Sequence, residues 1–352
     1  MININTQDNY STFNDNCQAI EDELNKKFSP KKEQSVLLSL SYKRLKFFNR
    51  SVRVADCGSW LEFLKCSEIK EGTESENYKL YRANFCRDRL CPMCAWRRSY
   101  KIFGQISKIM NYLGDKYRYI FLTLTVLNCG AHQLDRTIDN MQKAYSKLIR
   151  RKAFKTAIKG YFRALEVTRN KKNGTYHPHF HVVLAVLPSY FTSRDYIKRD
   201  EWLNMWRQSM KDNSITQVDV RTMKDKKTGE VFGTALSSAV AETAKYAVKS
   251  ADYIFENDDA LMDEIVDTLS ASLCRRRMTA FGGCFAEARD ILGLDDCEDG
   301  DLVHADDKIR SDIATMIVRY AWGCGAYKLV QKLELEIVDG VSVNPESGEI
   351  II

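Results

Sequence analysis

The chain has 352 residues, enough to bury a full hydrophobic core as two domains or as one decorated domain. Its 53 lysines and arginines only slightly outnumber its 47 acidic residues, so the formal charge of +6 does not by itself indicate a nucleic-acid ligand. The sequence shows neither an apolar run of about 18 residues nor a basic leader before an apolar stretch, which argues against a membrane span and a secretory signal. We therefore expect a cytoplasmic protein without a membrane partner, whose eleven cysteines are thiols or metal ligands.

The N-terminal part of the chain divides by composition into two regions. Residues 1–34 are polar with few apolar anchors, so we expect a flexible segment that tolerates deletion. Residues 35–110 are expected to form a basic, cysteine-rich region.

Cysteines in this region have the spacing of zinc ligands. Cys86, Cys91 and Cys94 read C-x4-C-P-x-C, and Cys57 upstream is predicted to complete a four-thiolate zinc site, with Cys66 as its rival. One alternative is that such a zinc ion only holds the segment together and has no part in DNA binding. Basic residues around the cysteines are candidate DNA contacts, namely Arg87, Arg89, Arg97 and Arg98.

An α+β core is predicted over residues 111–255. The pattern predicts a strand, a helix, a hairpin, a helix and a strand at residues 119–126, 134–150, 161–187, 199–211 and 216–222. This β-α-β-β-α-β order predicts an antiparallel sheet with helices on one face. Residues 256–352 are expected to form a helical C-terminal region that ends in a hairpin around Asp339 and Gly340.

A histidine-rich strand is the most informative segment of this core. His177, His179 and His181 alternate, so an extended strand places all three on one face. A two-residue turn at Asn173 and Gly174 would set Glu166 opposite His181. We predict that Glu166, His179 and His181 share a divalent cation.

Two features of this hairpin leave alternatives open. Pro178 cannot donate to a ladder, so it must lie at an edge, at an unbonded position or in a bulge that shifts the pairing. One or two of the histidines could instead serve only as hydrogen-bonding groups of the strand.

A second basic segment precedes the hairpin. Residues 143–159 carry seven lysines and arginines and no acid, which fits either a phosphate-binding surface or a solvated helix face. The candidate DNA contacts in it are Lys147, Arg150 and Arg151.

Residues 236–250 are rich in alanine and free of glycine and proline, so they predict a helix. Glu242, Tyr246 and Lys249 fall on one stripe of that helix. A tyrosine can attack a phosphodiester when a metal and cations stabilise the developing charge, and a carboxylate can later accept a proton. An ordinary amphipathic helix with a half-buried tyrosine is the alternative.

Taken together, the ordered motifs resemble those of the rolling-circle plasmid replication initiators of Gram-positive bacteria, which belong to the HUH endonuclease superfamily. The resemblance covers about residues 57–327. It rests on a cysteine-rich segment, a first motif, a strand that supplies an acidic ligand, a histidine motif and a nucleophile motif, at residues 85–99, 121–128, 166–170, 177–184 and 241–249.

The resemblance implies an HUH-type antiparallel sheet with flanking helices and a cysteine-rich zinc-binding insertion. It implies Mg or Mn at Glu166, His179 and His181, although such a ligand set also accepts Co or Zn in vitro. Tyr246 takes the place of the nucleophile, and Glu242 stands where other branches have a second tyrosine. His177 is a candidate for ordering the site.

The expected activity is that of a plasmid replication initiator. It nicks one strand of single-stranded or extruded origin DNA, leaves a 5′-phosphotyrosine and a free 3′-hydroxyl primer, and rejoins the DNA at termination. Glu242 would activate water for the second cleavage, and Lys249 would neutralise the phosphate. The expected partners are origin DNA and a host helicase with the replication machinery, and a second copy of the chain is a further candidate partner.

Two other readings share part of this evidence. A single-tyrosine HUH transposase needs a related site but acts on its own ends. A non-catalytic, zinc-dependent DNA-binding regulator would use the histidine strand only as structure.

Overall fold

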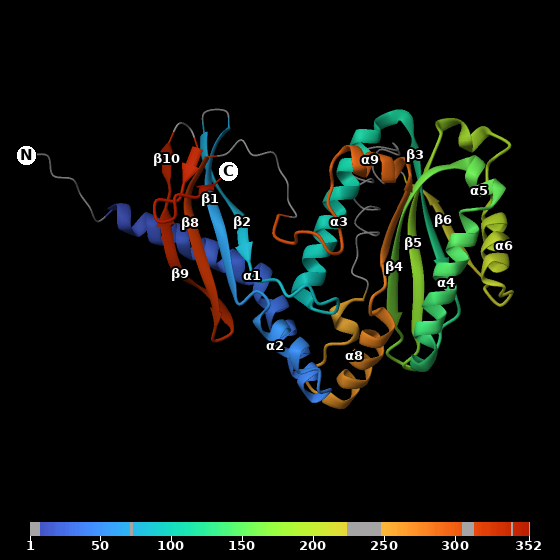
Figure 1. The fold of residues 1–352 in the computed structure, drawn as a ribbon, viewed down its shortest axis with the longest axis horizontal. Helices are drawn as coiled ribbons and strands as arrows, with labels where there is room; N and C mark the ends of the chain where they lie inside the picture. The colour runs from blue at the N-terminus through green and yellow to red at the C-terminus, as the bar shows by residue number, and fades with distance from the viewer. Residues whose placement is uncertain (1–7, 71–72, 224–247, 305–312, 339–340, 352) are drawn as a thin grey trace, which may run out of the picture. The chain divides into compact units, whose positions relative to one another are not determined.

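The computed structural model divides the chain into two compact units, one made of residues 1–94 and 302–352 and the other of residues 95–301 (Figure 1). The structure describes residues 8–70, 73–223, 248–304, 313–338 and 341–351. Glu242 and Tyr246 lie outside these residues, as does most of the helix predicted at residues 236–250. No helix in the described ranges combines the length and apolarity that crossing a membrane requires.

The second unit is built on a five-stranded antiparallel sheet of order β6-β3-β5-β4-β7. Its strands are β3 (Arg118–Thr125), β4 (Ile158–Arg169), β5 (Tyr176–Val186), β6 (Val218–Thr222) and β7 (Thr279–Gly283). The first four agree with the predicted strands within three residues at each end. The fifth strand, β7, was not predicted, and it pairs with β4 at the edge of the sheet.

Helices cover both faces of this sheet (Figure 1). They are α3 (Pro92–Leu113), α4 (Leu134–Leu148), α5 (Lys152–Ala157), α6 (Arg199–Met210), α8 (Asp259–Leu273) and α9 (Cys284–Ile291). On one face, the Tyr145 ring of α4 and the Trp206 ring of α6 pack against Phe180 of β5. On the other, Ile106 of α3 and Phe285 of α9 share a buried core with the sheet. The expectation of helices on one face is wrong because α3 and α9 come from outside residues 111–255.

The first unit combines the two ends of the chain. It contains α1 (Asp8–Arg44), α2 (Phe48–Asp56), β1 (Trp60–Lys70), β2 (Thr73–Ala83), β8 (Ile313–Gly323), β9 (Ala326–Glu334), β10 (Glu336–Val338), β11 (Val341–Val343) and β12 (Ile350–Ile351). Strands β2-β1-β8-β9 form one antiparallel sheet, and β10-β11-β12 form a small second one. Short 3-10 helices elsewhere in the chain are η1 (Gly114–Lys116), η2 (Ala131–Gln133), η3 (Pro188–Thr192) and η4 (Ser250–Asp252).

Two regional expectations need correction. The segment expected to be flexible up to residue 34 is helical from Asp8 onward within α1, and Leu24 and Phe28 are buried. Its polar composition hid a helical stripe of apolar anchors spaced about one turn apart. The C-terminal region is not mainly helical, because residues from β8 onward form strands, although β10 and β11 do pair as the predicted hairpin.

A substitution in the core of the first unit can test whether α1 packs there. Phe28 is 3% exposed, and its ring packs edge-on against Phe63 and Tyr327. Replacing Phe28 with alanine should lower the free energy of unfolding by about 3–5 kcal/mol, because it removes apolar contacts and leaves a cavity. Urea unfolding followed by tryptophan fluorescence measures the change.

The matched control is Leu40→Ala, on the same helix, because Leu40 is 45% exposed. It should change the free energy of unfolding by no more than about 0.5 kcal/mol. Equal effects of the two substitutions would show that α1 does not pack as described.

Candidate metal centres

The hairpin of β4 and β5 places a carboxylate on the histidine face. Glu166 pairs directly with His179, and His181 is the next residue of β5 on the same face. The predicted pairing of Glu166 with His181 is therefore wrong by two positions. Because side chains alternate with a period of two, this shift keeps Glu166 on the histidine face, whereas a shift of one would have moved it to the opposite face.

The turn explains the difference in register. It is a four-residue loop, residues 171–174, closed by hydrogen bonds from Gly174 N to Asn170 O and from Asn170 N to Thr175 O. Gly174 has a φ of +71°, a conformation that glycine adopts at little cost. Pro178 needs no bulge, because the pairing of β3 with β5 ends at His179 and leaves the proline beyond that ladder.

Three ligand atoms converge within the hairpin. The Nε2 atoms of His179 and His181 lie 3.1 Å apart, and they lie 3.3 Å and 2.8 Å from Oε2 of Glu166. Ligands held about 2.1 Å from one metal at angles of 90–109° are separated by about 3.0–3.4 Å. The three atoms are thus spaced as the ligands of a single ion, and this group can hold a metal.

Both imidazoles are oriented by contacts on their far side. Nδ1 of His179 lies 3.1 Å from the carbonyl oxygen of His177, and Nδ1 of His181 lies 3.5 Å from Oγ1 of Thr123. In the tautomer that carries its proton on Nδ1 and donates it to that carbonyl, His179 would offer the lone pair of Nε2 to a metal ion shared with Glu166. Contacts of this kind fix the tautomer and ring orientation of metal-binding histidines.

The carboxylate of Glu166 is held in its charged form. Burial alone would raise its pKa, but hydrogen bonds with His179 and His181 outweigh burial and hold the pKa well below its ordinary value. The ammonium group of Lys249 lies 3.8 Å from Oε1 of Glu166 while its side chain remains 53% exposed. One side of the metal group therefore carries a solvent-accessible positive charge.

A cavity of about 420 Å³ adjoins the histidine strand. It is lined by His177, by residues 125–128 after β3 and by residues 215–217 before β6. The Nε2 atom of His177 is buried and has no hydrogen-bond partner among the described residues. Burial, reinforced by the neighbouring His179, lowers the pKa of His177. His177 is not part of the three-residue metal group, so its predicted role in ordering the site stays a prediction.

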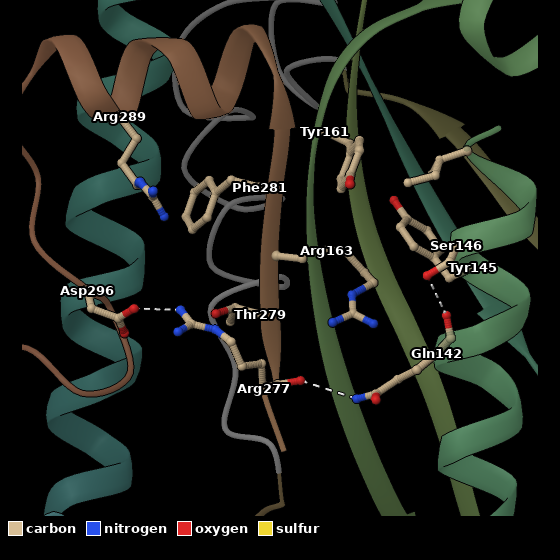
Figure 2. Close-up of a pocket in the computed structure, with 12 residues that line it drawn as sticks. Gln142, Tyr145, Ser146, Tyr161, Arg163, Arg277, Thr279, Phe281, Arg289 and Asp296 are labelled. Carbon is tan, nitrogen blue, oxygen red and sulfur yellow. Dashed lines mark hydrogen bonds and ion pairs between the residues drawn. The ribbon is translucent and has the colours of Figure 1, made fainter. Parts of the chain in front are cut away.

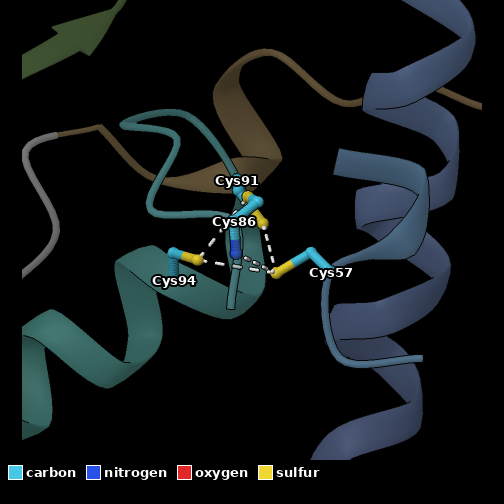
Figure 3. Close-up of side chains that lie close together, drawn as sticks. All are labelled: Cys57, Cys86, Cys91 and Cys94. Atoms are coloured by element: carbon cyan, nitrogen blue, oxygen red, sulfur yellow. Dashed lines mark hydrogen bonds between the residues drawn. The ribbon is translucent and has the colours of Figure 1, made fainter. Parts of the chain in front are cut away.

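Four cysteines form a second group in the first unit (Figure 3). Cys57 follows α2, Cys86 follows β2, and Cys91 and Cys94 flank the start of α3. The Sγ atoms of Cys57 and Cys91, of Cys57 and Cys94, and of Cys86 and Cys94 lie 3.5, 3.5 and 3.7 Å apart. Sulfurs around a tetrahedral ion at about 2.3 Å are separated by about 3.8 Å. The group can hold a metal ion, and Cys66 lies elsewhere, in an apolar cluster with Leu64.

Backbone donors surround the sulfurs. The amide groups of Cys86, Arg87 and Asp88 donate to Sγ of Cys57, Cys94 and Cys86 over 3.3, 3.2 and 3.4 Å. Such bonds favour the thiolate over the thiol. For Cys91, burial opposes ionisation, but hydrogen bonds with the other sulfurs and with Ser35 outweigh it and hold its pKa well below its usual value.

Two residues of α1 support this group and were not predicted. Ser35 Oγ lies 3.4 Å from Sγ of Cys91. Lys32 is 1% exposed and donates to the carbonyl oxygens of Ala55 and Cys57 over 2.6 and 2.9 Å. Burial lowers the pKa of Lys32, and the nearby thiols partly offset this. The sequence did contain a signal for these contacts. Lys32 and Ser35 follow Phe28 at intervals of about one helical turn, which places them on the buried stripe of α1.

The predicted DNA contacts differ in how accessible they are. Near the cysteines, Arg87 is exposed and Arg89 is half-buried. Arg97 is buried, with its guanidinium over the rings of Trp96 and Tyr100. Arg98 donates to the carbonyl oxygen of Glu298. Arg97 and Arg98 therefore have structural contacts that the sequence did not indicate.

The basic segment around α4 lies on the sheet face opposite the histidines. Lys147 and Arg150 are exposed there, whereas Arg151 donates to Ser209 and Gln208 of α6. This basic surface and the Glu166 group therefore occupy different faces of one sheet.

Comparison with known proteins agrees with the motifs. Residues 77–328 match a family model described as a replication protein. The chain is 38% identical over 272 residues to a protein rep of Streptococcus pneumoniae, which covers 76% of this chain and 79% of that one. It is 36% identical over 308 residues to a protein rep of Lentilactobacillus hilgardii, covering 85% and 93%. A protein rep of Staphylococcus aureus is 37% identical over 238 residues, covering 67% and 97%. No solved structure matches the chain.

The chain belongs to this family of replication proteins. The resemblance to plasmid replication initiators of Gram-positive bacteria, given by the ordered sequence motifs, is thereby confirmed.

The cysteine group predicts a tightly bound metal ion. Protein purified without added metal should contain about one equivalent, because four converging thiolates bind a thiophilic ion strongly. Cys91→Ser should lose it, and elemental analysis of the desalted protein measures the loss. Cys66→Ser is the matched control, since Cys66 is also buried but lies outside the group. Metal content unchanged by Cys91→Ser would contradict the assignment.

Proposed function

We propose that the protein nicks one strand of origin DNA, with Tyr246 as the nucleophile, beside the group formed by Glu166, His179 and His181. The observation that carries this proposal is the convergence of these three ligand atoms within 3.3 Å of one another, in a member of a replication-protein family. The β-α-β-β-α-β order, with the histidines on the central strand β5, supports an HUH-type assignment for the second unit.

Lys249 connects the nucleophile motif to the metal group. It follows Tyr246 by three residues, so covalent geometry keeps the two Cα atoms within about 11 Å of each other. The Lys249 ammonium lies 3.8 Å from Glu166, and this contact supports the proposal that Tyr246 can reach the metal group. The same ammonium can neutralise a phosphate bound there.

The charge balance of the site suits a phosphodiester. Two neutral imidazoles and one carboxylate carry a net charge of −1, so a divalent cation leaves the group positive, and Lys249 adds a further positive charge. We propose Mg or Mn as the ion, which would polarise the scissile phosphate and stabilise charge on its oxygens. Glu166, His179 and His181 would hold the ion, and the cavity lined by His177 would receive the flanking strand.

The proposed reaction is an exchange of phosphate esters. The phenolic oxygen of Tyr246 forms a bond to phosphorus while the bond to the 3′-oxygen breaks, and the phenolic proton is balanced by protonation of that oxygen. The products are a 5′-phosphotyrosine and a 3′-hydroxyl that can prime synthesis. At termination, Glu242 accepts a proton from a water molecule that attacks the phosphorus of the second cleavage site, where the bond to the 3′-oxygen breaks. The new 3′-hydroxyl then attacks the phosphotyrosine and the phenolic oxygen of Tyr246 leaves with a proton, which rejoins the DNA and releases the protein. An initiator with this role would need a host helicase as a partner to unwind the nicked DNA.

For the cysteine group we propose zinc. Four thiolates in a buried, closed arrangement leave no position for a substrate, which is typical of structural zinc. The ion would hold the start of α3 against the loop after α2.

A covalent adduct tests the nicking proposal. Protein with Mn and single-stranded oligonucleotides that tile the DNA flanking its gene should give a protein–DNA band that survives denaturing electrophoresis. Tyr246→Phe should abolish the band, because it removes the attacking oxygen. Tyr196→Phe is the matched control, since Tyr196 is 44% exposed in the same unit and should leave the adduct unchanged. Tight binding with no adduct would instead favour a DNA-binding regulator, and cleavage without an adduct a simple metal hydrolase.

Separate assays of nicking and termination test the role of Glu242. Glu242→Ala should nick at a normal rate but accumulate covalent complex at termination, because the carboxylate acts only when water attacks. Gel quantification of adduct formation and release over time measures the two steps. An equal loss of both activities would show that Glu242 has a different role.

A further inference from the structure

A buried arginine lies on the sheet face opposite the histidines. Arg163 of β4 is 6% exposed, and three positions separate it from Glu166, so the two side chains leave opposite faces of the strand. Its guanidinium lies 4.4 Å from the ring centroid of Phe180 and 5.4 Å from that of Tyr145. Its Nε has no hydrogen-bond partner in the described part of the chain. Aromatic rings stabilise the cation, but they do not replace the hydrogen bonds that a buried guanidinium loses with water.

Two acids near Arg163, Asp296 in the cavity lining and Glu298, are already engaged by other donors. Asp296 pairs with Arg277 at 2.5 Å and accepts the backbone amide of Glu298 over 2.8 Å. Burial would raise the pKa of Asp296, but these donors outweigh burial and hold it at about 2. The side chain of Glu298 accepts the backbone amides of Met278 and Thr279. In the described ranges, therefore, neither acid makes a hydrogen bond or ion pair with Arg163 that would neutralise it.

A second unpaired polar group faces the same space. The hydroxyl of Tyr145 on α4 is buried and has no hydrogen-bond partner among the residues that the structure covers. Burial raises the pKa of Tyr145 well above its ordinary value, so the hydroxyl keeps its proton and remains a donor. Arg163 and Tyr145 both line a cavity of about 540 Å³ (Figure 2). Two buried donors that lack acceptors thus border one cavity.

The remaining charges of the cavity are mainly positive. Arg277, which precedes β7, and Arg289 of α9 also line it, and Asp296 is the one acid among the described lining residues (Figure 2). Arg289 pairs with the exposed Asp290 and lies over the ring of Phe281. Three guanidinium groups against one carboxylate favour an anionic ligand that offers several acceptor oxygens.

We propose that this cavity binds a phosphate group, with Arg163 and Tyr145 as donors at its base and Arg277 and Arg289 at its rim. The volume also admits a sugar or base attached to the phosphate. The phosphate can belong to a DNA strand that follows the basic surface of α4, or it can be a free phosphate. Arg163 and Tyr145 lie on the other face of the sheet from Glu166, and Arg277 and Arg289 flank the edge strand β7, so the site is separate from the Glu166 group.

Inorganic phosphate is the first probe. At matched ionic strength and without added divalent metal, phosphate but not chloride should raise the melting temperature of the full chain. Omitting the metal prevents phosphate from binding at the Glu166 group. Arg163→Gln should weaken phosphate binding at least about tenfold, the loss expected for one charged hydrogen bond. Arg194→Gln is the matched control, because Arg194 is an exposed arginine of the same unit away from the cavity, and it should bind phosphate normally.

A labelled single strand is the second probe and separates the two sources. If the phosphate belongs to DNA, Arg163→Gln should weaken binding of the labelled strand in fluorescence anisotropy. It should also reduce the slope of log affinity against log salt by about 0.7. Arg194→Gln should leave both the affinity and the slope unchanged. If the phosphate is free, Arg163→Gln should lose phosphate binding and keep its DNA affinity. Native protein that responds to neither probe, or an Arg163→Gln variant that responds as native protein does, overturns the proposal.

Rim variants keep the test decisive if Arg163→Gln does not fold. Arg277 is 59% exposed at its side chain, so Arg277→Gln removes a rim charge without disturbing the core. Arg277→Gln should weaken phosphate binding severalfold, and the double variant with Arg289→Gln should weaken it further. Unchanged phosphate binding in the double variant would exclude the cavity. Because both readouts measure binding, their failure would leave the covalent-adduct test of Tyr246 unaffected.

Discussion

The pairing of β4 with β5 is the constraint on which the candidate metal site depends. It sets one carboxylate and two imidazoles side by side, since Glu166 is directly opposite His179. The strand with the histidines is central, with β3 on one side and β4 on the other, and apolar cores on both faces oppose any slip of one residue. A rigid support of this kind lowers the entropy that must be lost when the ligands converge on an ion.

The two candidate metal groups differ in how closed they are. All four cysteines belong to the same compact packing of loops and helix ends, and three of them are fully buried. Among the described residues, the Glu166 group offers three ligand atoms, and it lies beside an exposed ammonium, that of Lys249. A four-ligand buried group suits an ion that supports the fold, whereas a three-ligand group with an accessible side leaves room for a substrate oxygen.

Much of the second unit could be predicted from sequence because its elements have clear local periodicity. The alternation of His177, His179 and His181 identified the correct face of the strand. The turn was misjudged, but the register error was an even number of residues, so Glu166 stayed on the face of the histidines. The error came from Gly174, which serves as the left-handed residue of a longer loop and not as half of a two-residue turn. Local patterns carry no information on partners far along the chain, so the pairing of Trp60 with Ala321 could not be foreseen.

The same limit explains what was missed at the cysteines. Their spacing indicated three candidate ligands and offered two choices for the fourth, because only the fold separates Cys57 from Cys66. Lys32 was overlooked because residues 1–34 were expected to be flexible, and Ser35, just beyond them, was not considered as a contact of the cysteines. Arg97 shows the converse error: its charge suggested a DNA contact, yet the structure buries it over its own helix neighbours.

The joining of the two chain ends in one sheet has a consequence for synthesis. Strand β1 emerges from the ribosome roughly 13–50 s before β8 at typical rates of elongation, so its edge stays without that partner throughout this time. The four cysteines, by contrast, are all translated by residue 94 and can close around an ion early. A nascent chain thus has a local means of ordering its beginning while the open strand edge, a usual starting point for aggregation, awaits the end of translation.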